Sequence, residues 1–171
     1  MQKRVLIIQN VKANHHHVSY LDGLARALDR AKFEPIVVLQ AGVDITEGYP
    51  PPNYELHLLP GATYSVPGQA QFMAAAMNLL DGMEGVDIIH CSNPFSSVLP
   101  ALLHKKLRGA SCKVIYDMRG LWVEFAVHSG SFPPAFAKVI DAIDVAALHA
   151  SDGVIAISPK LKEVLITKKG V

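Results

Sequence analysis

Short apolar runs alternate along the chain with longer segments in which apolar residues recur every three or four positions. Short runs rich in β-branched residues are typical of strands buried on both faces, and the periodic segments are typical of amphipathic helices. The pattern predicts strands at residues 4–9, 34–40, 55–59, 86–91, 112–116 and 154–157. It predicts helices at residues 18–28, 67–80, 94–108, 135–150 and 159–169.

This alternation of strand and helix indicates an α/β fold. We expect a doubly wound, mostly parallel, Rossmann-like sheet of about six strands, with helices on both faces and right-handed crossovers. A chain of 171 residues is long enough to form one such domain, residues 1–171, with a core that needs no disulfide. Cys91 and Cys112 lie in or beside predicted buried strands, which favours core thiols in a reduced protein.

Local signals refine the element boundaries. Asn93 is a predicted helix N-cap, with Pro94 at the first helical position. Gly109 is expected to end that helix after a basic last turn. Three prolines within residues 48–53 predict a loop, and a second long loop is expected from the end of the fifth strand to residue 134.

Composition narrows the functional classes. The formal net charge is +1, so no global field attracts nucleic acid or an anionic membrane, and no nucleic-acid partner is expected. Residues 1–4 lead directly into a strand, without a signal peptide, and no apolar run reaches membrane-spanning length. We expect a cytoplasmic protein, or one peripheral to the inner face of the membrane. Only 18% of residues are charged, against about 25% in an average protein, which also fits an apolar surface meant for a partner.

The candidate site lies where the predicted strands end. The fifth strand runs into Asp117, Arg119, Gly120 and Glu124. In an open parallel sheet, ligands bind at the carboxyl ends of the strands, at the point where the winding direction reverses. A reversal beside the first strand would bring these residues together with polar residues that follow strands one and four: Asn10, Lys12, Asn14, His15, His16, His17, His90, Ser92 and Asn93.

Several familiar chemistries do not fit this constellation. No glycine occurs between Met1 and Gly23, so the first turn lacks the dinucleotide-binding motif, and no phosphate-binding GxxxxGK[ST] loop is present. The three adjacent histidines diverge on a loop and lack a partner motif, so no metal site is predicted. His90 is open to two interpretations, a hydrogen-bonded core histidine or a site residue. Asp117 and Arg119 could equally form a structural ion pair.

Three segments resemble a known family. They are Tyr116–Trp122 (YDMRGLW), which is followed by Glu124, then Ala150–Ser158 (ASDGVIAIS), and Asp87–His90 (DIIH). Together they resemble the amino-terminal domain of family-four-like retaining glycosyltransferases, which have the two-domain GT-B architecture. The resemblance implies that the chain is one half of a GT-B fold. It implies an acceptor-side domain that contains no cofactor, with the nucleotide-sugar donor bound mainly by a carboxy-terminal domain absent from this chain.

The resemblance also implies a reaction and a set of site residues. The reaction would transfer a sugar from a nucleotide-sugar donor to a sugar or lipid-linked acceptor, with retention and no obligatory metal. The implied catalytic residues are Asp117, which could orient an acceptor hydroxyl, and Arg119, which could hold a phosphate or carboxylate or fix the loop. The implied substrate-binding residues are Asn14, His15, His16, His90, Asn93, Gly120 and Glu124.

Two departures from the family pattern bear on these roles. Family members often have two glycines in the loop after the first strand, where this chain has Asn14 and three histidines. Many also have histidine where Arg119 stands here. Two alternatives therefore stay open: half of a nucleotide-sugar epimerase of the same architecture, and a non-catalytic α/β binding module.

Overall fold

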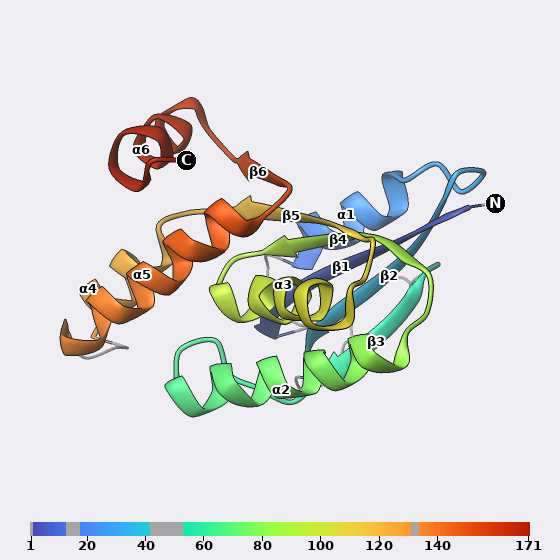
Figure 1. Cartoon of the computed structure of the whole chain (residues 1–171), viewed down its shortest axis with the longest axis horizontal. Coiled ribbons are helices and arrows are strands. Elements are labelled where there is room, and N and C mark those ends of the chain that lie inside the picture. The colour runs from blue at the N-terminus through green and yellow to red at the C-terminus, as the bar shows by residue number, and fades with distance from the viewer. Residues whose placement is uncertain (1, 13–17, 42–52, 131–133) are drawn as a thin grey trace.

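The computed structural model describes residues 2–12, 18–41, 53–130 and 134–171 (Figure 1). The strands are β1 (Lys3–Lys12), β2 (Phe33–Gln40), β3 (Glu55–Leu59), β4 (Val86–Ser92), β5 (Lys113–Met118) and β6 (Gly153–Ala156). The helices are α1 (Val18–Ala27), α2 (Val66–Gly82), α3 (Phe95–Arg108), α4 (Trp122–His128), α5 (Pro134–Ala150) and α6 (Pro159–Lys169).

The strands form one parallel sheet in the order β3-β2-β1-β4-β5-β6. The chain winds outward from β1 to β3, returns to the other side of β1 with β4, and winds outward again to β6. The predicted doubly wound α/β fold is therefore confirmed, and the sheet has the reversal beside the first strand that the candidate site assumes. Because ligands bind where the winding reverses, the carboxyl ends of β1 and β4 mark the expected crevice.

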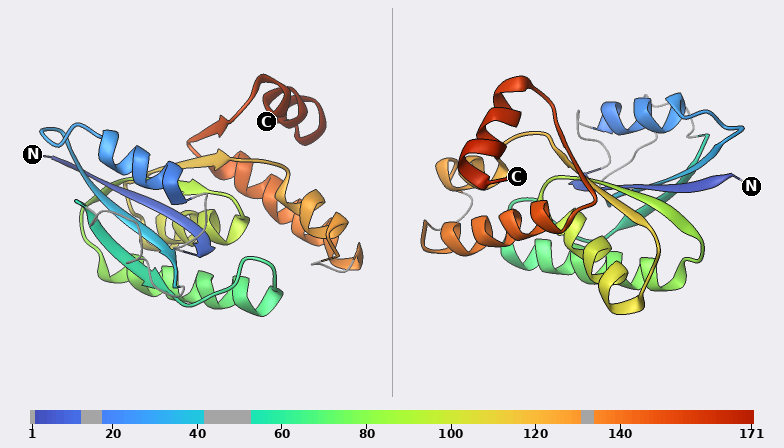
Figure 2. Two further views of the ribbon diagram at one scale, coloured as in Figure 1. Left: turned by 180° about the vertical axis from the view of Figure 1, so that it is seen from behind. Right: turned by 45° about the horizontal axis from the view of Figure 1, so that its top comes forward.

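Helices cover both faces of the sheet, as expected for central strands that are largely buried (Figure 2). On one face, α1 packs Leu21 and Ala25 against alternate residues of β1 and β2. On the other face, α2, α3 and α5 pack against the remaining alternate residues, in the larger core cluster. Cys91 and Cys112 are buried free thiols in this cluster, as predicted.

Two local predictions were wrong. The long loop expected after β5 contains a helix, α4, whose Trp122, Val123 and Ala126 form a buried stripe at helical spacing. Asn93 is not the N-cap of α3, because the cap position falls on Pro94 and no side chain caps this helix. The side chain of Asn93 is instead bonded across to the β5–α4 loop. The αL cap at Gly109 was predicted correctly.

No helix in the described part of the chain combines the length and the apolar content that crossing a bilayer requires.

Buried ionisable groups hold α5 against β5 and α6. Asp144 of α5 is 5% exposed and accepts a hydrogen bond of 2.6 Å from the hydroxyl of Tyr116 on β5. Lys169, the last residue of α6, pairs with Asp141 on α5 and lies 3.4 Å from Glu124 on α4. Burial raises the pKa of Asp144 to about 6, although the Tyr116 hydroxyl and the Lys169 cation both act to lower it.

We expect Asp144 to make the fold less stable as the pH rises through 6. Its pKa is higher in the folded than in the unfolded chain, so ionisation favours unfolding, and the cost grows between about pH 4 and pH 7. Between pH 5 and pH 7.5 the free energy of unfolding should fall by an amount on the order of 1 kcal/mol. Asp144→Asn should remove this loss. Urea unfolding at both pH values measures it.

Tyr116→Phe serves as the comparison for this prediction. It removes a hydrogen bond that favours the Asp144 carboxylate, so it should enlarge the loss between the two pH values. If Asp144→Asn keeps the wild-type difference between pH 5 and pH 7.5, the assignment of this pH dependence to Asp144 is wrong.

Candidate functional site

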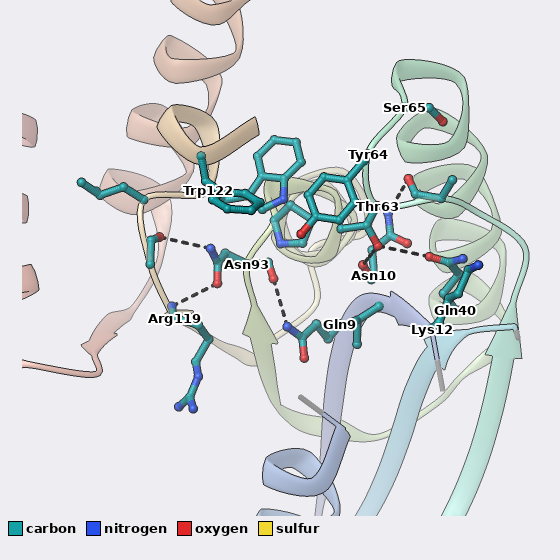
Figure 3. A pocket seen from close by; sticks show the side chains of 16 residues that line it. Gln9, Asn10, Lys12, Gln40, Thr63, Tyr64, Ser65, Asn93, Arg119 and Trp122 are labelled. Atoms are coloured by element: carbon teal, nitrogen blue, oxygen red, sulfur yellow. Dashed lines mark hydrogen bonds between the residues drawn. The ribbon is translucent and has the colours of Figure 1, made fainter. Parts of the chain in front are cut away.

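A pocket of about 890 Å³ opens at the carboxyl ends of β1 and β4, at the reversal point of the sheet (Figure 3). Four segments line it: the end of β1 with Gln40 of β2, the loop between β3 and α2, the β4–α3 turn, and the β5–α4 segment. The lining residues are Gln9, Asn10, Val11, Lys12, Gln40, Ala62, Thr63, Tyr64, Ser65, Asn93, Pro94, Arg119, Gly120, Leu121, Trp122 and Phe125.

Asn93 connects three of these segments. Its side-chain oxygen accepts a hydrogen bond of 3.0 Å from the backbone N–H of Arg119, and its Nδ2 donates to the carbonyl of Gly120 at 3.2 Å. Its own carbonyl accepts from the side chain of Gln9 at 3.2 Å. The Asn93 N–H donates to the carbonyl of Asp117. One buried residue thus fixes the β4–α3 turn to the β5–α4 loop and to β1 (Figure 3).

The floor between β1, β2 and the β3–α2 loop consists of uncharged polar groups. The hydroxyl of Thr63 lies within hydrogen-bond distance of the carbonyl of Asn10, at 2.8 Å, and of the side-chain oxygen of Gln40, at 3.2 Å. The amide of Asn10 donates to the hydroxyl of Ser96 on α3 at 3.0 Å. Gln9, Asn10 and Gln40 are each at most 5% exposed, so this floor is a buried polar network.

Aromatic rings form one wall of the pocket. Trp122, the only tryptophan of the chain, stacks on Tyr64 with ring centroids 6.4 Å apart and meets Phe95 edge to face at 5.7 Å. Tyr64 also contacts Phe125, with centroids 6.1 Å apart. Trp122 is nearly buried, whereas Tyr64 and Phe125 are about half exposed. The wall therefore joins the β3–α2 loop to α4 and gives the pocket an apolar side.

The loop that carries Thr63 and Tyr64 lies tightly against α2. A Cβ at Gly61 would be 2.7 Å from the Cβ of Phe72, and one at Gly68 would be 2.4 Å from the Cβ of Ala62. Such separations are far inside van der Waals contact, so glycine is required for this approach. Ser65 caps α2 by accepting a hydrogen bond from the N–H of Gly68. Backbone packing therefore sets the position of Tyr64.

Asp117 is fully buried and is not among the residues that line the pocket. Its carboxylate is 0% exposed, and its Oδ2 lies 3.2 Å from Nε2 of His90 and 3.4 Å from the hydroxyl of Ser92. One guanidinium nitrogen of Arg119 lies 3.8 Å from the same oxygen. The structure thus brings His90, Asp117 and Arg119 together, as predicted from the strand ends. In this arrangement Asp117 acts on the pocket only through its neighbours.

Arg119 lines the pocket but directs its guanidinium away from the aromatic wall (Figure 3). The guanidinium carbon lies 3.7 Å from the centre of the Tyr20 ring on α1, a cation–π contact. Burial and the nearby Asp117 carboxylate raise the pKa of Tyr20, while the Arg119 cation acts to lower it. Arg119 therefore joins α1 to the end of β5, and its side chain remains 30% exposed.

The remaining predicted site residues differ in whether they line the pocket. Gly120 lines the pocket, together with Asn93 and Arg119. Glu124 does not line it, because its carboxylate faces Lys169 on α6. The predicted residues Asn14, His15 and His16 lie outside the described residues. The catalytic and binding roles given to these side chains from the sequence stay predictions.

Several lining residues were not predicted as site residues. Tyr64 and Phe125 could not be assigned to the pocket without knowing that the β3–α2 loop meets α4. Gln40 had an available signal, because it is a polar residue at the end of a strand next to β1. Gln9 had the same signal, at the end of a run of apolar residues on β1 itself.

The charges of the lining residues limit the kinds of ligand that the pocket suits. Its described residues include two cations, Lys12 and Arg119, and no carboxylate. Lys12 and Gln40 lie on the side of the pocket opposite Arg119 (Figure 3). Among the described residues, no group of three or more His, Cys, Asp or Glu side chains could hold a metal ion. This surface suits a neutral or anionic ligand rich in hydroxyl groups.

Sequence comparison identifies the family. Residues 18–171 match glycosyltransferase family 4. Since this match spans most of the chain, the chain belongs to that family, as the segments around Asp117 and Ser151 suggested. No match is found among curated proteins.

The chain is also similar to solved structures. A Listeria monocytogenes protein assigned as a UDP-N-acetylglucosamine 2-epimerase superposes with a TM-score of 0.64 at 16% identity, covering 98% of this chain and 43% of that one. MurG of Acinetobacter baumannii matches with a TM-score of 0.46 at 12% identity, covering 90% of this chain and 45% of that one. The chain spans less than half the length of either protein. The first likeness supports the predicted Rossmann-like half of a GT-B fold.

We expect Asn93→Ala to destabilise the protein by about 2 kcal/mol, because two part-buried hydrogen bonds of the buried Asn93 side chain are lost and the backbone groups of Arg119 and Gly120 lose these partners. Urea unfolding followed by Trp122 fluorescence measures this. Asn78→Ala, on the exposed side of α2, is the matched control and should change stability by less than about 0.5 kcal/mol. Equal stability of the two variants would contradict the bridging role of Asn93.

Proposed function

We propose that this domain binds the acceptor in a glycosyltransferase that moves a sugar from a nucleotide-sugar donor to an acceptor hydroxyl, with retention of configuration. The observation that carries the proposal is the pocket at the reversal point of the sheet, in a chain that belongs to glycosyltransferase family 4. Its floor of amide and hydroxyl groups matches the hydrogen-bonding needs of a sugar. Its aromatic wall can cover the C–H face of a sugar ring.

In this proposal the nucleotide and phosphates of the donor are bound mainly by a second domain. The chain spans less than half the length of the two solved structures it matches, which leaves room for such a domain. The described lining of the pocket contains neither a phosphate-binding glycine loop nor a cluster of cations. We propose that the complete protein acts in the cytoplasm, or at the inner face of the membrane, without a resident cofactor or metal.

The contribution of this domain to catalysis is positioning. Transfer breaks the bond between the anomeric carbon and the donor phosphate, forms a bond to an acceptor oxygen, and releases the proton of that hydroxyl. Holding the acceptor hydroxyl against the anomeric carbon lowers the entropic part of the barrier. Arg119 adds a positive charge at the edge of the crevice, where negative charge develops on the departing phosphate.

The second candidate is a nucleotide-sugar epimerase, which shares the fold but needs no acceptor. Product analysis separates the two. The full-length protein is incubated with UDP-, GDP- and ADP-linked sugars, with and without a panel of free sugars, alkyl glycosides and lipid-linked sugars. Transfer should yield a new glycoside with the anomeric configuration of the donor, detected by mass spectrometry and NMR. A changed sugar on the nucleotide without any acceptor indicates the epimerase, and no product in any mixture indicates a binding module.

Arg119→Ala in the full-length enzyme should lower kcat/KM for transfer by at least about tenfold, a loss of about 1.4 kcal/mol of transition-state stabilisation. The cause is loss of the positive charge beside Asp117 and of the contact with Tyr20. Initial-rate kinetics measure it, and Arg119→Lys should restore part of the loss. Arg108→Ala is the control, since Arg108 also pairs with a carboxylate but lies in the last turn of α3. Equal rates for Arg119→Ala and wild type assign Arg119 a structural role.

A further inference from the structure

The aromatic wall exposes more apolar surface than binding a sugar ring requires. Tyr64 is 48% exposed and Phe125 is 57% exposed, yet both pack in one cluster with the nearly buried Trp122. Two half-exposed rings at the rim of a pocket gain free energy when a ligand removes them from water. A bare hexose presents hydroxyl groups around its edge, so it can cover one ring face but not both rings together.

The polar groups of the pocket are arranged separately from this wall. The uncharged floor formed by Gln9, Asn10, Gln40 and Thr63 follows the ends of β1 and β2, while the wall is formed by Tyr64 of the β3–α2 loop and by Trp122 and Phe125 of α4 (Figure 3). The two surfaces meet at Asn93, whose carbonyl is bonded to Gln9 and whose side chain is bonded to the loop before Trp122. A ligand that fills the whole pocket therefore has a hydroxyl-rich part and a compact apolar part.

We propose that the acceptor is a glycoside with an apolar aglycone, in which the sugar lies on the polar floor and the aglycone lies on Tyr64, Trp122 and Phe125. This inference rests on the proposed acceptor-binding function and specifies its substrate class. The absence of a carboxylate among the described lining residues disfavours a cationic ligand and is compatible with a neutral glycoside. The aglycone can come from a soluble alkyl or aryl glycoside or from a membrane lipid, since both present the same chemistry to the wall.

Trp122 supplies a direct measurement, because it is the only tryptophan in the 171-residue chain. Its fluorescence is titrated with octyl glycosides of glucose, galactose, mannose and N-acetylglucosamine, each kept below its micelle-forming concentration. The parent free sugars and octanol are titrated in parallel. We expect at least one octyl glycoside to bind at least about tenfold more tightly than its free sugar and than octanol. If no glycoside exceeds both, the proposal is wrong.

Two phenylalanines provide matched variants. Phe125→Ala should weaken binding of that glycoside by about tenfold, since Phe125 forms the exposed part of the wall. Phe136→Ala should leave it unchanged, because Phe136 is similarly exposed, at 52%, but lies on α5 outside the pocket lining. Thermal unfolding checks that both variants fold. Equal binding by Phe125→Ala and Phe136→Ala would overturn the assignment of the aglycone to this wall.

The source of the aglycone is tested with the same chain. Sedimentation with neutral phosphatidylcholine vesicles, with and without a long-chain glycolipid bearing the preferred sugar, distinguishes a membrane lipid from a soluble glycoside. If the chain sediments only with vesicles that contain the glycolipid, and Phe125→Ala abolishes this sedimentation, a membrane lipid is the source. If the chain does not sediment with these vesicles but binds an octyl glycoside tightly, a soluble glycoside is the source. The outcome is separable from the proposed function: a full-length enzyme that transfers to free sugars while octyl glycosides bind no better would overturn this inference alone.

Discussion

One primary amide holds the crevice in shape. Parallel strands that diverge from a reversal point leave their loops unsupported by sheet hydrogen bonds, so something else must bind those loops together. Here it is Asn93, which reaches the backbone at Arg119 and Gly120 and receives Gln9 from the neighbouring strand. Buried polar groups in such a network gain little net energy when satisfied but cost much when a partner is lost. The arrangement favours a single conformation of the pocket floor.

The sequence predicted the sheet well, because burial on both faces leaves a strong signal. Strands β1 and β2 contain continuous apolar runs, at residues 5–8 and 36–39, and the alternation with helices indicates a parallel sheet, whereas the place where the winding reverses had to be assumed. The short helix α4 escaped prediction because seven residues after a Gly-Leu pair carry too little periodicity to distinguish a helix from a loop. Asn93 was misassigned for a related reason. Asn before Pro is a frequent cap, and only the fold shows that its side chain has backbone partners on another loop.

Part of the candidate site could be predicted from the sequence. Polar residues at the ends of β4 and β5 could be grouped once a reversal point was assumed, and Asn93, Arg119 and Gly120 do line the pocket. Glu124 could not be excluded from the site by its sequence position. Its partner Lys169 is 45 positions later in the chain, and the two residues come together only in the folded protein. The aromatic wall depends on a contact between the β3–α2 loop and α4, which no local pattern encodes.

The close packing at Gly61 and Gly68 makes the backbone path of the β3–α2 loop independent of the side chain that the loop exposes to the pocket. The path of the β3–α2 loop is determined by backbone contact with α2, whereas the surface shown to the pocket comes from the half-exposed ring of Tyr64. A residue of another size or polarity at position 64 can therefore alter what the pocket accepts without rerouting the chain. Evolution or a protein engineer could diversify selectivity at this point while the scaffold stays constant.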